Sequence, residues 1–461
     1  MKKITLVKED FKNITGSVLY HFDLFKNLTS VTIDSRKVKK NSLFVAIKGD
    51  NFDGHNFVKN AVKSGAAAVV IKKGKLKNLK ELKVPIVAVK DTTIALGEIA
   101  NIWRSKLRAT VIGITGSNGK TSTKEMIAAL LGEKFTVNKT IANNNNQIGV
   151  PITIFSTNTE HDFLVLEMGT NHFGEIAYNS RIAVPDYALI TNIGSSHLEF
   201  FKNKEGVYKE KIALFKITSE KKGLLFINND DSYLRDSYKE YKNKITFGFK
   251  FSPDVKGKLL GYDKSGNAKL KIKYKKEEFE VELPAAGENN AKNFLASAAV
   301  ALKAGLTKDE IIKASEKLRN FNKRLNVKKL KDFVLVDDTY NANPESMKAA
   351  IEFISKFKNS SKKIIILGDM FELGSKEKKL HEELSSSIVK NKIDVVILIG
   401  KRMKFLSSKL DHKKISNKYF TSRKRLNEFL KGLDFSSSVI LVKGSRGMKM
   451  EEFINTITEK K

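Results

Sequence analysis

The chain of 461 residues is too long for one ordinary hydrophobic core, so roughly two to four domains are expected. It contains no cysteine, which excludes disulfides, thiolate zinc sites and cysteine nucleophiles. The formal net charge of +33 permits nucleic-acid binding, but the lysines are spread along the whole length. This spread favours a solvated, lysine-rich surface, and attraction of polyanionic small substrates is a further alternative.

The sequence shows no segment for membrane insertion or export. No run of about 18 apolar residues is present. The N-terminus, MKKITLVKEDFKNITGS, has basic residues but no apolar stretch before its charges resume. We therefore expect a cytoplasmic protein without a membrane span.

Residues 1–107 predict a small α/β domain. The segment VTIDSRKVKKNSLFVAIKG indicates two short strands around a polar loop. A helix is expected from about His55 to Ser64, with Gly65 as its stop signal. Ala66 to Ile71 then has the character of a strand.

Residues 108–325 predict a mostly parallel sheet with helices. The apolar runs FLVLEMG, YALITNIG and GLLFIN alternate with helical patterns. From about residue 245 to 283, the segments KITFGFK, AKLKIKYKK and EFEVEL instead alternate in polarity, which predicts an antiparallel patch. A strong helix is expected over 289–305.

Residues 326–461 repeat the α/β pattern. The segments FVLVDD, KIIILGDM, DVVILIG and SVILVKGSRG predict four strands, each running into a polar or Gly-containing loop. In such sheets ligands bind at the carboxyl ends of the strands.

The segment ITGSNGKTST lies between an apolar run and a helical pattern, as phosphate-binding loops do. Gly116 and Gly119 would let backbone N–H groups approach a phosphate chain, Lys120 would reach the β- and γ-phosphates, and Thr121 would ligate Mg²⁺. The strict pattern has glycine five residues before Gly119, where this chain has Ile114. Because strand, loop and helix agree, a nucleotide site is favoured over a fortuitous glycine-rich turn.

Glu167 and His197 each follow an apolar run, so both are expected at the sheet edge that carries this loop. A carboxylate suits Mg²⁺, whereas imidazole is not its usual ligand. A helix cap at Glu167 and an ordinary loop role for His197 remain open from these residues alone.

Two segments of the last block carry charged residues after strands. Asp337 and Asp338 precede the polar turn TYNANPES, and they would either bind a ribose or order the turn and cap its helix. Lys443 and Arg446, in VKGSRGMKMEE, would either clamp an anion or lie exposed as solvated cations.

An ordered set of motifs resembles those of the Mur ligases and spans nearly the whole chain. The motifs are TGSNGKTS, TIANNNNQIGVPITIF (with Ala142 where glycine is usual), LEMGTNHFGEI, ALITNIGSSHLEFF, DDTYNANPESM, LGDMFELG and VKGSRGMKME. The last two favour the family member that adds D-alanyl-D-alanine, and the acceptor signature Asp-Asn-Pro-Arg of the diaminopimelate-adding sibling is absent.

The resemblance implies an α/β fold of three domains. It implies a UDP-sugar-binding domain over 1–107, a central P-loop ATPase with a mostly parallel sheet over 108–325, and a Rossmann-like domain over 326–461 that binds the D-Ala-D-Ala acceptor. The implied reaction transfers the γ-phosphate of ATP to the carboxylate of UDP-N-acetylmuramoyl-tripeptide. The amine of D-Ala-D-Ala then attacks this acyl phosphate, giving the pentapeptide precursor of peptidoglycan with ADP and phosphate. A monomer that closes around its substrates is expected, with two Mg²⁺ ions as cofactors.

Matching positions imply roles for individual residues. The implied catalytic and metal-binding residues are Lys120, Thr121, Glu167, His197 and Lys211, with Lys211 as a carbamate rather than its neighbour Lys209. The implied ATP-binding residues are Gly116, Ser117, Asn118, Gly119, Lys120, Thr121, Ser122, Asn290, Asn293, Arg324 and Asp338, while Asn289 stands where histidine is usual. The implied UDP-sugar residues are Ser35, Arg36, Asp53 and His55, and those on the acceptor side are Asn341, Asn343, Lys443, Ser445 and Arg446.

Other functions remain open at this point. A sibling ligase would use another amine acceptor, and a folylpolyglutamate synthetase would share the central ATPase but lack a UDP-sugar domain like residues 1–107. An NTP-dependent nucleic-acid protein or a catalytically silent nucleotide-binding regulator belongs to a different class. The third residue of the tripeptide, lysine or diaminopimelate, is not readable from the sequence.

Overall fold

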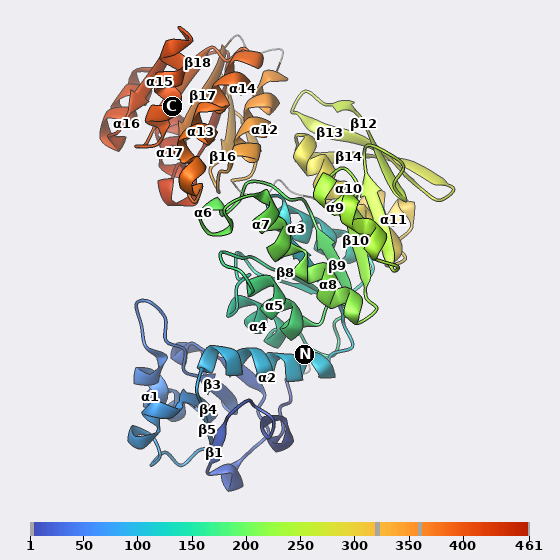
Figure 1. Cartoon of the computed structure of the whole chain (residues 1–461), viewed down its shortest axis with the longest axis vertical. Helices are drawn as coiled ribbons and strands as arrows, with labels where there is room; N and C mark the ends of the chain where they lie inside the picture. The colour runs from blue at the N-terminus through green and yellow to red at the C-terminus, as the bar shows by residue number, and fades with distance from the viewer. Residues whose placement is uncertain (1–3, 319–322, 358–361, 460–461) are drawn as a thin grey trace.

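Three separate β-sheets organise the chain into three domains, which follow one another along the long axis of the molecule (Figure 1). The computed structural model describes residues 4–318, 323–357 and 362–459. The three-domain α/β fold predicted from the sequence is therefore confirmed. In the described part of the chain, no helix is both long and apolar enough to cross a membrane.

The N-terminal domain has a five-stranded sheet in the order β1-β5-β4-β3-β2, parallel except for β1 against β5. The expected helix from His55 begins as a 3₁₀ turn over Gly54–Phe57, because Asp53 caps it by accepting a hydrogen bond from the His55 N–H. The elements are β1 (Val18–Tyr20), β2 (Ser30–Thr32), β3 (Ser42–Val45), α1 (Val58–Lys63), β4 (Ala66–Lys72), β5 (Ile86–Val89) and α2 (Thr92–Lys106).

The long helix α2 joins this domain to the next one. It packs against α4 (Gly149–Phe155) and α5 (Glu175–Ala183) of the central domain. The Trp103 indole N–H donates to the Thr157 carbonyl, and the Arg104 guanidinium pairs with Asp186 at 2.8 Å. Trp103 is buried, so the junction between these two domains is a packed interface.

The central domain has a nine-stranded sheet in the order β14-β13-β12-β11-β10-β9-β6-β8-β7. Helices α3 and α10 pack together on one face over buried Ile112 and Ile114. The elements are β6 (Thr110–Thr115), α3 (Lys120–Leu131), β7 (Val137–Lys139), α4 (Gly149–Phe155), β8 (Phe163–Glu167), α5 (Glu175–Ala183), β9 (Tyr187–Ile190), α6 (Leu198–Phe201), α7 (Lys204–Lys211), α8 (Ala213–Glu220), β10 (Leu224–Asn228), α9 (Ser232–Ser237), β11 (Lys244–Gly248), β12 (Val255–Tyr262), β13 (Asn267–Tyr274), β14 (Glu277–Ala286), α10 (Glu288–Lys303) and α11 (Lys308–Glu316).

The antiparallel patch predicted between about residue 245 and 283 is smaller than expected. Strand β11, which contains KITFG, pairs in parallel with both β10 and β12, so assigning it to the patch was wrong. Only β12, β13 and β14 are antiparallel, and they extend the same sheet. Alternating polarity indicates that one face of a strand is solvated. It does not determine whether the neighbouring strand runs parallel or antiparallel.

The C-terminal domain has a six-stranded sheet in the order β15-β16-β20-β17-β18-β19, with apolar cores on both faces. The four predicted strands are present, and two short strands at the edges, β15 and β19, were missed. The elements are β15 (Asn326–Lys329), β16 (Val334–Asp338), α12 (Pro344–Ser355), β17 (Lys362–Gly368), α13 (Glu377–Glu382), α14 (Leu384–Lys390), β18 (Val395–Ile399), α15 (Met403–His412), β19 (Asn417–Phe420), α16 (Arg423–Gly432), β20 (Ser438–Lys443) and α17 (Glu451–Thr458).

Candidate functional site

The loop between β6 and α3 has the backbone that a phosphate site needs. Gly116 and Gly119 have positive φ angles of 147° and 82°. A Cβ at Gly116 would lie 1.9 Å from Thr191 Oγ1, and one at Gly119 would lie 2.3 Å from Asn293 Oδ1. Side chains are therefore excluded at both positions. By contrast, Ile114 lies buried within β6, so its departure from the strict pattern falls outside the turn.

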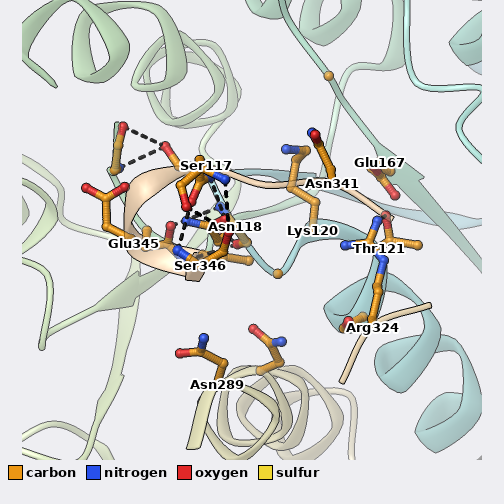
Figure 2. Close-up of a pocket in the computed structure, with 18 of the residues that line it drawn as sticks. Ser117, Asn118, Lys120, Thr121, Glu167, Asn289, Arg324, Asn341, Glu345 and Ser346 are labelled. Atoms are coloured by element: carbon orange, nitrogen blue, oxygen red, sulfur yellow. Dashed lines mark hydrogen bonds between the residues drawn. The ribbon is translucent and has the colours of Figure 1, made fainter. Parts of the chain in front are cut away.

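Hydrogen bonds from the central domain itself and from the C-terminal domain hold the loop at Asn118 (Figure 2). The Asn118 carbonyl accepts from Thr191 Oγ1 at 2.5 Å and from Asn192 Nδ2 at 3.0 Å, and its N–H donates to Asn192 Oδ1. From the C-terminal domain, Asn343 Nδ2 donates to Asn118 Oδ1 at 2.7 Å. Ser117 Oγ accepts from the Gly194 N–H at 2.8 Å.

Lys120 begins α3, and its ammonium donates to the Gly116 carbonyl at 2.8 Å. Burial lowers the pKa of Lys120, and the nearby Glu167 carboxylate opposes this shift. An anion added to the cavity would therefore stabilise the charged form of Lys120, as expected for a lysine that binds phosphate.

Glu167 ends β8 and is 2% exposed. Its Oε1 accepts from Asn145 Nδ2 at 2.9 Å, and the buried Lys124 ammonium lies 3.9 Å from Oε2. Within the described residues, Oε2 has no hydrogen-bond partner. A buried carboxylate oxygen without a donor, in the same cavity as Thr121, fits a hard divalent cation that completes its shell with phosphate oxygens and water.

Asn145 and Lys124 were missed from the sequence. Lys124 also donates to the carbonyls of Thr140 at 2.7 Å and Ala142 at 3.4 Å, and so ties the Asn-rich loop to α3. The only available signal for Asn145 was its place in the run of asparagines, which did not indicate which one faces Glu167.

His197 lies directly before α6 in a left-handed conformation with φ of 52°. Its Nδ1 lies 2.6 Å from Glu372 Oε2 in the C-terminal domain, and this contact lowers the pKa of Glu372. Glu372 was not predicted, although LGDMFELG was noted. The imidazole lines the same cavity as Glu167, so both polar residues meet at the predicted sheet edge.

Lys211 ends α7 and is 1% exposed, whereas Lys209 is exposed. Burial lowers the pKa of Lys211 well below its ordinary value, Lys120 adds repulsion, and Glu210 opposes both. Within the described residues, its ammonium forms no hydrogen bond or ion pair. A buried amine of this kind is held toward its neutral, nucleophilic form.

Helix α10 carries the asparagines of GENNAKNFLAS. Asn290 and Asn293 are buried, and Asn290 Nδ2 donates to the Ala286 carbonyl at 2.8 Å. Asn289, which replaces the usual histidine, is exposed at the cavity. Asn293 is the residue against which Gly119 packs, so α10 and the phosphate loop are in direct contact.

Arg324 reaches from the start of the C-terminal domain to the phosphate loop (Figure 2). Its guanidinium donates to Thr121 Oγ1 at 3.1 Å and lies 3.9 Å from the centre of the Tyr340 ring. Asp338 Oδ1 accepts from the Leu325 N–H, and its Oδ2 lies 2.6 Å from the buried Lys443 ammonium. Lys443, expected on the acceptor side, is thus the internal partner of Asp338.

The other residues expected on the acceptor side form turns. Asn341 Oδ1 accepts from the Arg446 N–H at 3.2 Å, and Ser445 Oγ accepts from the Phe371 N–H at 2.8 Å. The Arg446 guanidinium pairs with Glu451 at 3.1 Å. Asn343 caps α12 through the Ser346 N–H, besides its contact with Asn118.

Glu345, another residue that was not predicted, bridges the two domains beside the loop (Figure 2). Its carboxylate accepts from the Ser195 N–H at 3.0 Å and from Ser195 Oγ at 2.9 Å, and it pairs with Lys204 at 2.9 Å. Burial alone would raise the pKa of Glu345, but these partners keep that pKa below its ordinary value.

These side chains surround one cavity of about 670 Å³ between the central and C-terminal domains. Most of the expected site residues line it. Those that do so are Ser117, Asn118, Gly119, Lys120, Thr121, Ser122, Glu167, His197, Asn290, Asn293, Arg324, Asp338, Asn341, Asn343 and Lys443. Gly116, Lys211, Ser445 and Arg446 are not among its lining residues.

The residues expected to bind the UDP-sugar lie in the N-terminal domain, outside this cavity. Arg36 is exposed and pairs with Asp34 at 2.9 Å, and it follows Ser35 in a 3₁₀ turn. His55 is buried, with Nδ1 2.6 Å from Asp53 and Nε2 accepting from the Lys72 N–H at 2.9 Å. Both ring nitrogens of His55 are thus used inside the domain.

A glycine-rich loop, a cavity lysine and a buried carboxylate at the carboxyl edge of a parallel sheet define a nucleotide-binding enzyme of the P-loop class. Family models match the chain in three stretches: "Mur ligase family, catalytic domain" over 27–104, "Mur ligase middle domain" over 114–301, and "Mur ligase, glutamate ligase domain" over 323–446. The chain belongs to the Mur ligase family.

Within this family, the chain is similar to several ligases named for the addition of D-alanyl-D-alanine or as MurF. The UDP-N-acetylmuramoyl-tripeptide–D-alanyl-D-alanine ligase of Bacillus subtilis is 36% identical over 432 residues, 93% of each chain. A crystal structure of MurF from Acinetobacter baumannii is 29% identical with a TM-score of 0.88 and full coverage of both chains. The MurF ligase of Thermotoga maritima in complex with ADP is 30% identical with a TM-score of 0.83, covering 94% of this chain and 97% of that one.

Proposed function

We propose that this protein joins D-alanyl-D-alanine to UDP-N-acetylmuramoyl-tripeptide in an ATP-dependent reaction that supplies the peptidoglycan precursor. The relatives that match over nearly their whole length carry the name of this activity. The observation that carries the proposal is the interdomain cavity, where Lys120 and Glu167 of the central domain face Arg324 of the C-terminal domain. The N-terminal, central and C-terminal domains are assigned to the UDP-sugar, ATP and dipeptide, respectively.

The reaction requires that a carboxylate, which is a poor electrophile, be activated by ATP, although both reactants are anions. A carboxylate resists attack by an amine until phosphorylation gives it a good leaving group. The loop N–H groups, Lys120 and Arg324 are assigned to the triphosphate, because their positive charges cancel the repulsion between ATP and the substrate carboxylate. Asp338 is assigned to the ribose, and Asn290 and Asn293 to the nucleoside side of the cavity.

Mg²⁺ is assigned to Thr121 and Glu167, with His197 at a second ion, and it would supply charge neutralisation at the phosphates. The free Oε2 of Glu167 supports this assignment. Lys211 is proposed to react with CO₂ as a neutral amine, because a carbamate oxygen would hold a cation that an ammonium repels. Its burial and lowered pKa support that reaction.

In the N-terminal domain, Arg36 is proposed as the diphosphate partner, because its guanidinium is exposed and a diphosphate would compete with Asp34 for it. Ser35, Asp53 and His55 are assigned to the same site, Asp53 and His55 as residues that shape its wall. The protein is further proposed to act as a monomer in the cytoplasm, because its nucleotide substrates are available there.

Phosphate release tests the function. Purified protein should release phosphate from ATP only when UDP-N-acetylmuramoyl-tripeptide and D-Ala-D-Ala are both present, and mass spectrometry should find the pentapeptide product. Lys120→Ala should abolish ligation while leaving the circular dichroism and thermal unfolding unchanged. Turnover with a single amino acid in place of the dipeptide would assign a sibling activity instead.

A further inference from the structure

A second cavity, of about 500 Å³, lies between the central and C-terminal domains and belongs to none of the assignments above. The central domain contributes Ser195 and Lys204 to its wall, and the C-terminal domain contributes Lys376 and Lys379 from the turn before α13 and from α13 itself. Its volume falls in the range of small-molecule sites, roughly 300–1,000 Å³.

The two cavities meet at one hydrogen-bonded contact. Ser195 lines the second cavity, and Glu345, which accepts hydrogen bonds from Ser195, lines the nucleotide cavity. The carboxylate of Glu345 therefore stands at the boundary between them. Within the described residues, its Oε2 accepts one hydrogen bond, from the Ser195 N–H at 3.0 Å, so it retains capacity for a further donor.

The charges of the second cavity are divided between cationic and anionic groups. Glu383 is compensated by Lys348 at 2.9 Å, and Lys204 is paired with Glu345. In the described structure Lys376 and Lys379 form no ion pair, and Glu205 is the remaining acidic residue of the wall. The cavity thus offers two uncommitted ammonium groups, while a carboxylate marks its border with the nucleotide site.

We propose that this second cavity binds the acceptor as a zwitterionic dipeptide, with the dipeptide carboxylate against Lys376 and Lys379 and its ammonium against Glu345. This inference rests on the proposed function, in which D-Ala-D-Ala is the acceptor. The orientation follows from the chemistry, because the amine has to reach an acyl phosphate in the nucleotide cavity. A dipeptide spans roughly 7 Å, which is short enough for such a cavity to hold it end to end.

The contacts of the residues first expected on the acceptor side agree with this placement. The Lys443 ammonium is buried against Asp338, the Ser445 hydroxyl accepts from the Phe371 N–H, and the Arg446 guanidinium pairs with Glu451. The polar groups of Lys443 and Ser445 are therefore occupied inside the domain, whereas the Arg446 guanidinium is exposed and keeps further donors. The lysines of the second cavity are exposed and able to pair with an entering carboxylate.

The first experiment measures steady-state kinetics of the double variant Lys376→Met/Lys379→Met. The KM for D-Ala-D-Ala should rise about tenfold, as expected for the loss of a charge-assisted contact, with kcat and the KM for ATP unchanged. Lys378→Met is the matched control, because this exposed lysine of the same helix does not line the cavity. An unchanged dipeptide KM in the double variant, or an equal rise in the control, would overturn the proposal.

The second experiment removes the charge from the ligand instead. D-Ala-D-alaninamide should have a KM about tenfold above that of D-Ala-D-Ala with the wild-type enzyme, and about the same KM with the double variant. Equal penalties in both enzymes would place the carboxylate elsewhere. Glu345→Gln, which keeps an acceptor for Ser195, should raise the dipeptide KM and leave that of UDP-N-acetylmuramoyl-tripeptide unchanged.

Failure of the proposed function is distinguishable from failure of this site. If the wild-type enzyme releases no phosphate with D-Ala-D-Ala, the proposed function is wrong. Calorimetric titration of D-Ala-D-Ala into the ADP-loaded wild-type and double-variant proteins then tests whether the second cavity binds the dipeptide. Binding that is weakened in the variant supports the site, whereas absent or equal binding refutes it.

Discussion

Replacing Lys443 with methionine separates a structural role for this lysine from a role in acceptor binding. The Lys443 side chain is 2% exposed, and its ammonium lies 2.6 Å from Asp338 Oδ2 and 2.9 Å from the Asn341 carbonyl. The Asp338 side chain is 12% exposed. Lys443→Met would leave that carboxylate with the Leu325 N–H as its remaining donor among the described residues.

Loss of one partner of a buried ion pair costs about 3–5 kcal/mol, because the remaining charge stays desolvated. For a domain of this size that corresponds to a decrease of roughly 10–20 °C in Tm. Differential scanning calorimetry would follow the transition of the C-terminal domain. The exposed Lys424, replaced by methionine, is the matched control and should change the free energy of unfolding by less than about 0.5 kcal/mol.

The double variant Lys443→Met/Asp338→Asn also removes the negative charge of Asp338, which Lys443→Met leaves without its partner. It should recover about 1–3 kcal/mol relative to the sum of the single effects, since the two groups are in direct contact. A Lys443→Met protein that unfolds within one or two degrees of the wild type (about 0.5 kcal/mol) but has a raised dipeptide KM would refute this reasoning. Lys443 would then serve the acceptor rather than Asp338.

Four further outcomes are expected. Gly116→Ala should destabilise the protein by about 2–4 kcal/mol in thermal unfolding and abolish ATP binding, because its Cβ displaces Thr191 and the φ of 147° is strained; unchanged ADP affinity in a calorimetric titration would contradict this. Ala142→Gly should raise stability by up to about 1 kcal/mol, since Ala142 has a φ of 51°, and a clear loss of Tm would argue against strain there. Removal of CO₂ should lower ligation reversibly in the wild type and in the Lys209→Ala control, and ¹³C-bicarbonate should give a carbamate resonance that Lys211→Ala lacks. X-ray scattering should show a smaller radius of gyration with all substrates bound, and superimposable profiles would count against domain closure.

The sequence predicted those features that local patterns determine. The phosphate loop was recognisable because Gly116, Gly119 and Lys120 are close in sequence and their geometry is set by adjacent residues. Glu167 was placed at the right edge because the carboxyl ends of parallel strands meet there. The helix capped by Asn343 and the strands of the C-terminal domain followed from turn chemistry and apolar runs.

The rest depended on contacts between distant segments. His197 and Glu372 are 2.6 Å apart in space but belong to different domains, and nothing local to LGDMFELG indicates that partner. Glu345 lies in a motif that was noted, yet its pairing with Ser195 and Lys204 exists only once the domains are packed. The contact between Lys443 and Asp338 was not predicted for the same reason, because a cation after a strand gives no sign of an acid on the neighbouring strand.

The four hydrogen bonds at Asn118 have a consequence for cooperativity. Three of them come from the central domain, and the fourth comes from Asn343 of the C-terminal domain. A movement that separates those domains breaks that fourth bond, so the shape of the phosphate loop and the placement of the C-terminal domain are thermodynamically linked. By reciprocity, any ligand that fixes this placement tightens nucleotide binding by the factor with which nucleotide favours the placement. The Asn343–Asn118 contact is thus one of the bonds across the domain boundary through which substrate binding on one side changes nucleotide affinity on the other.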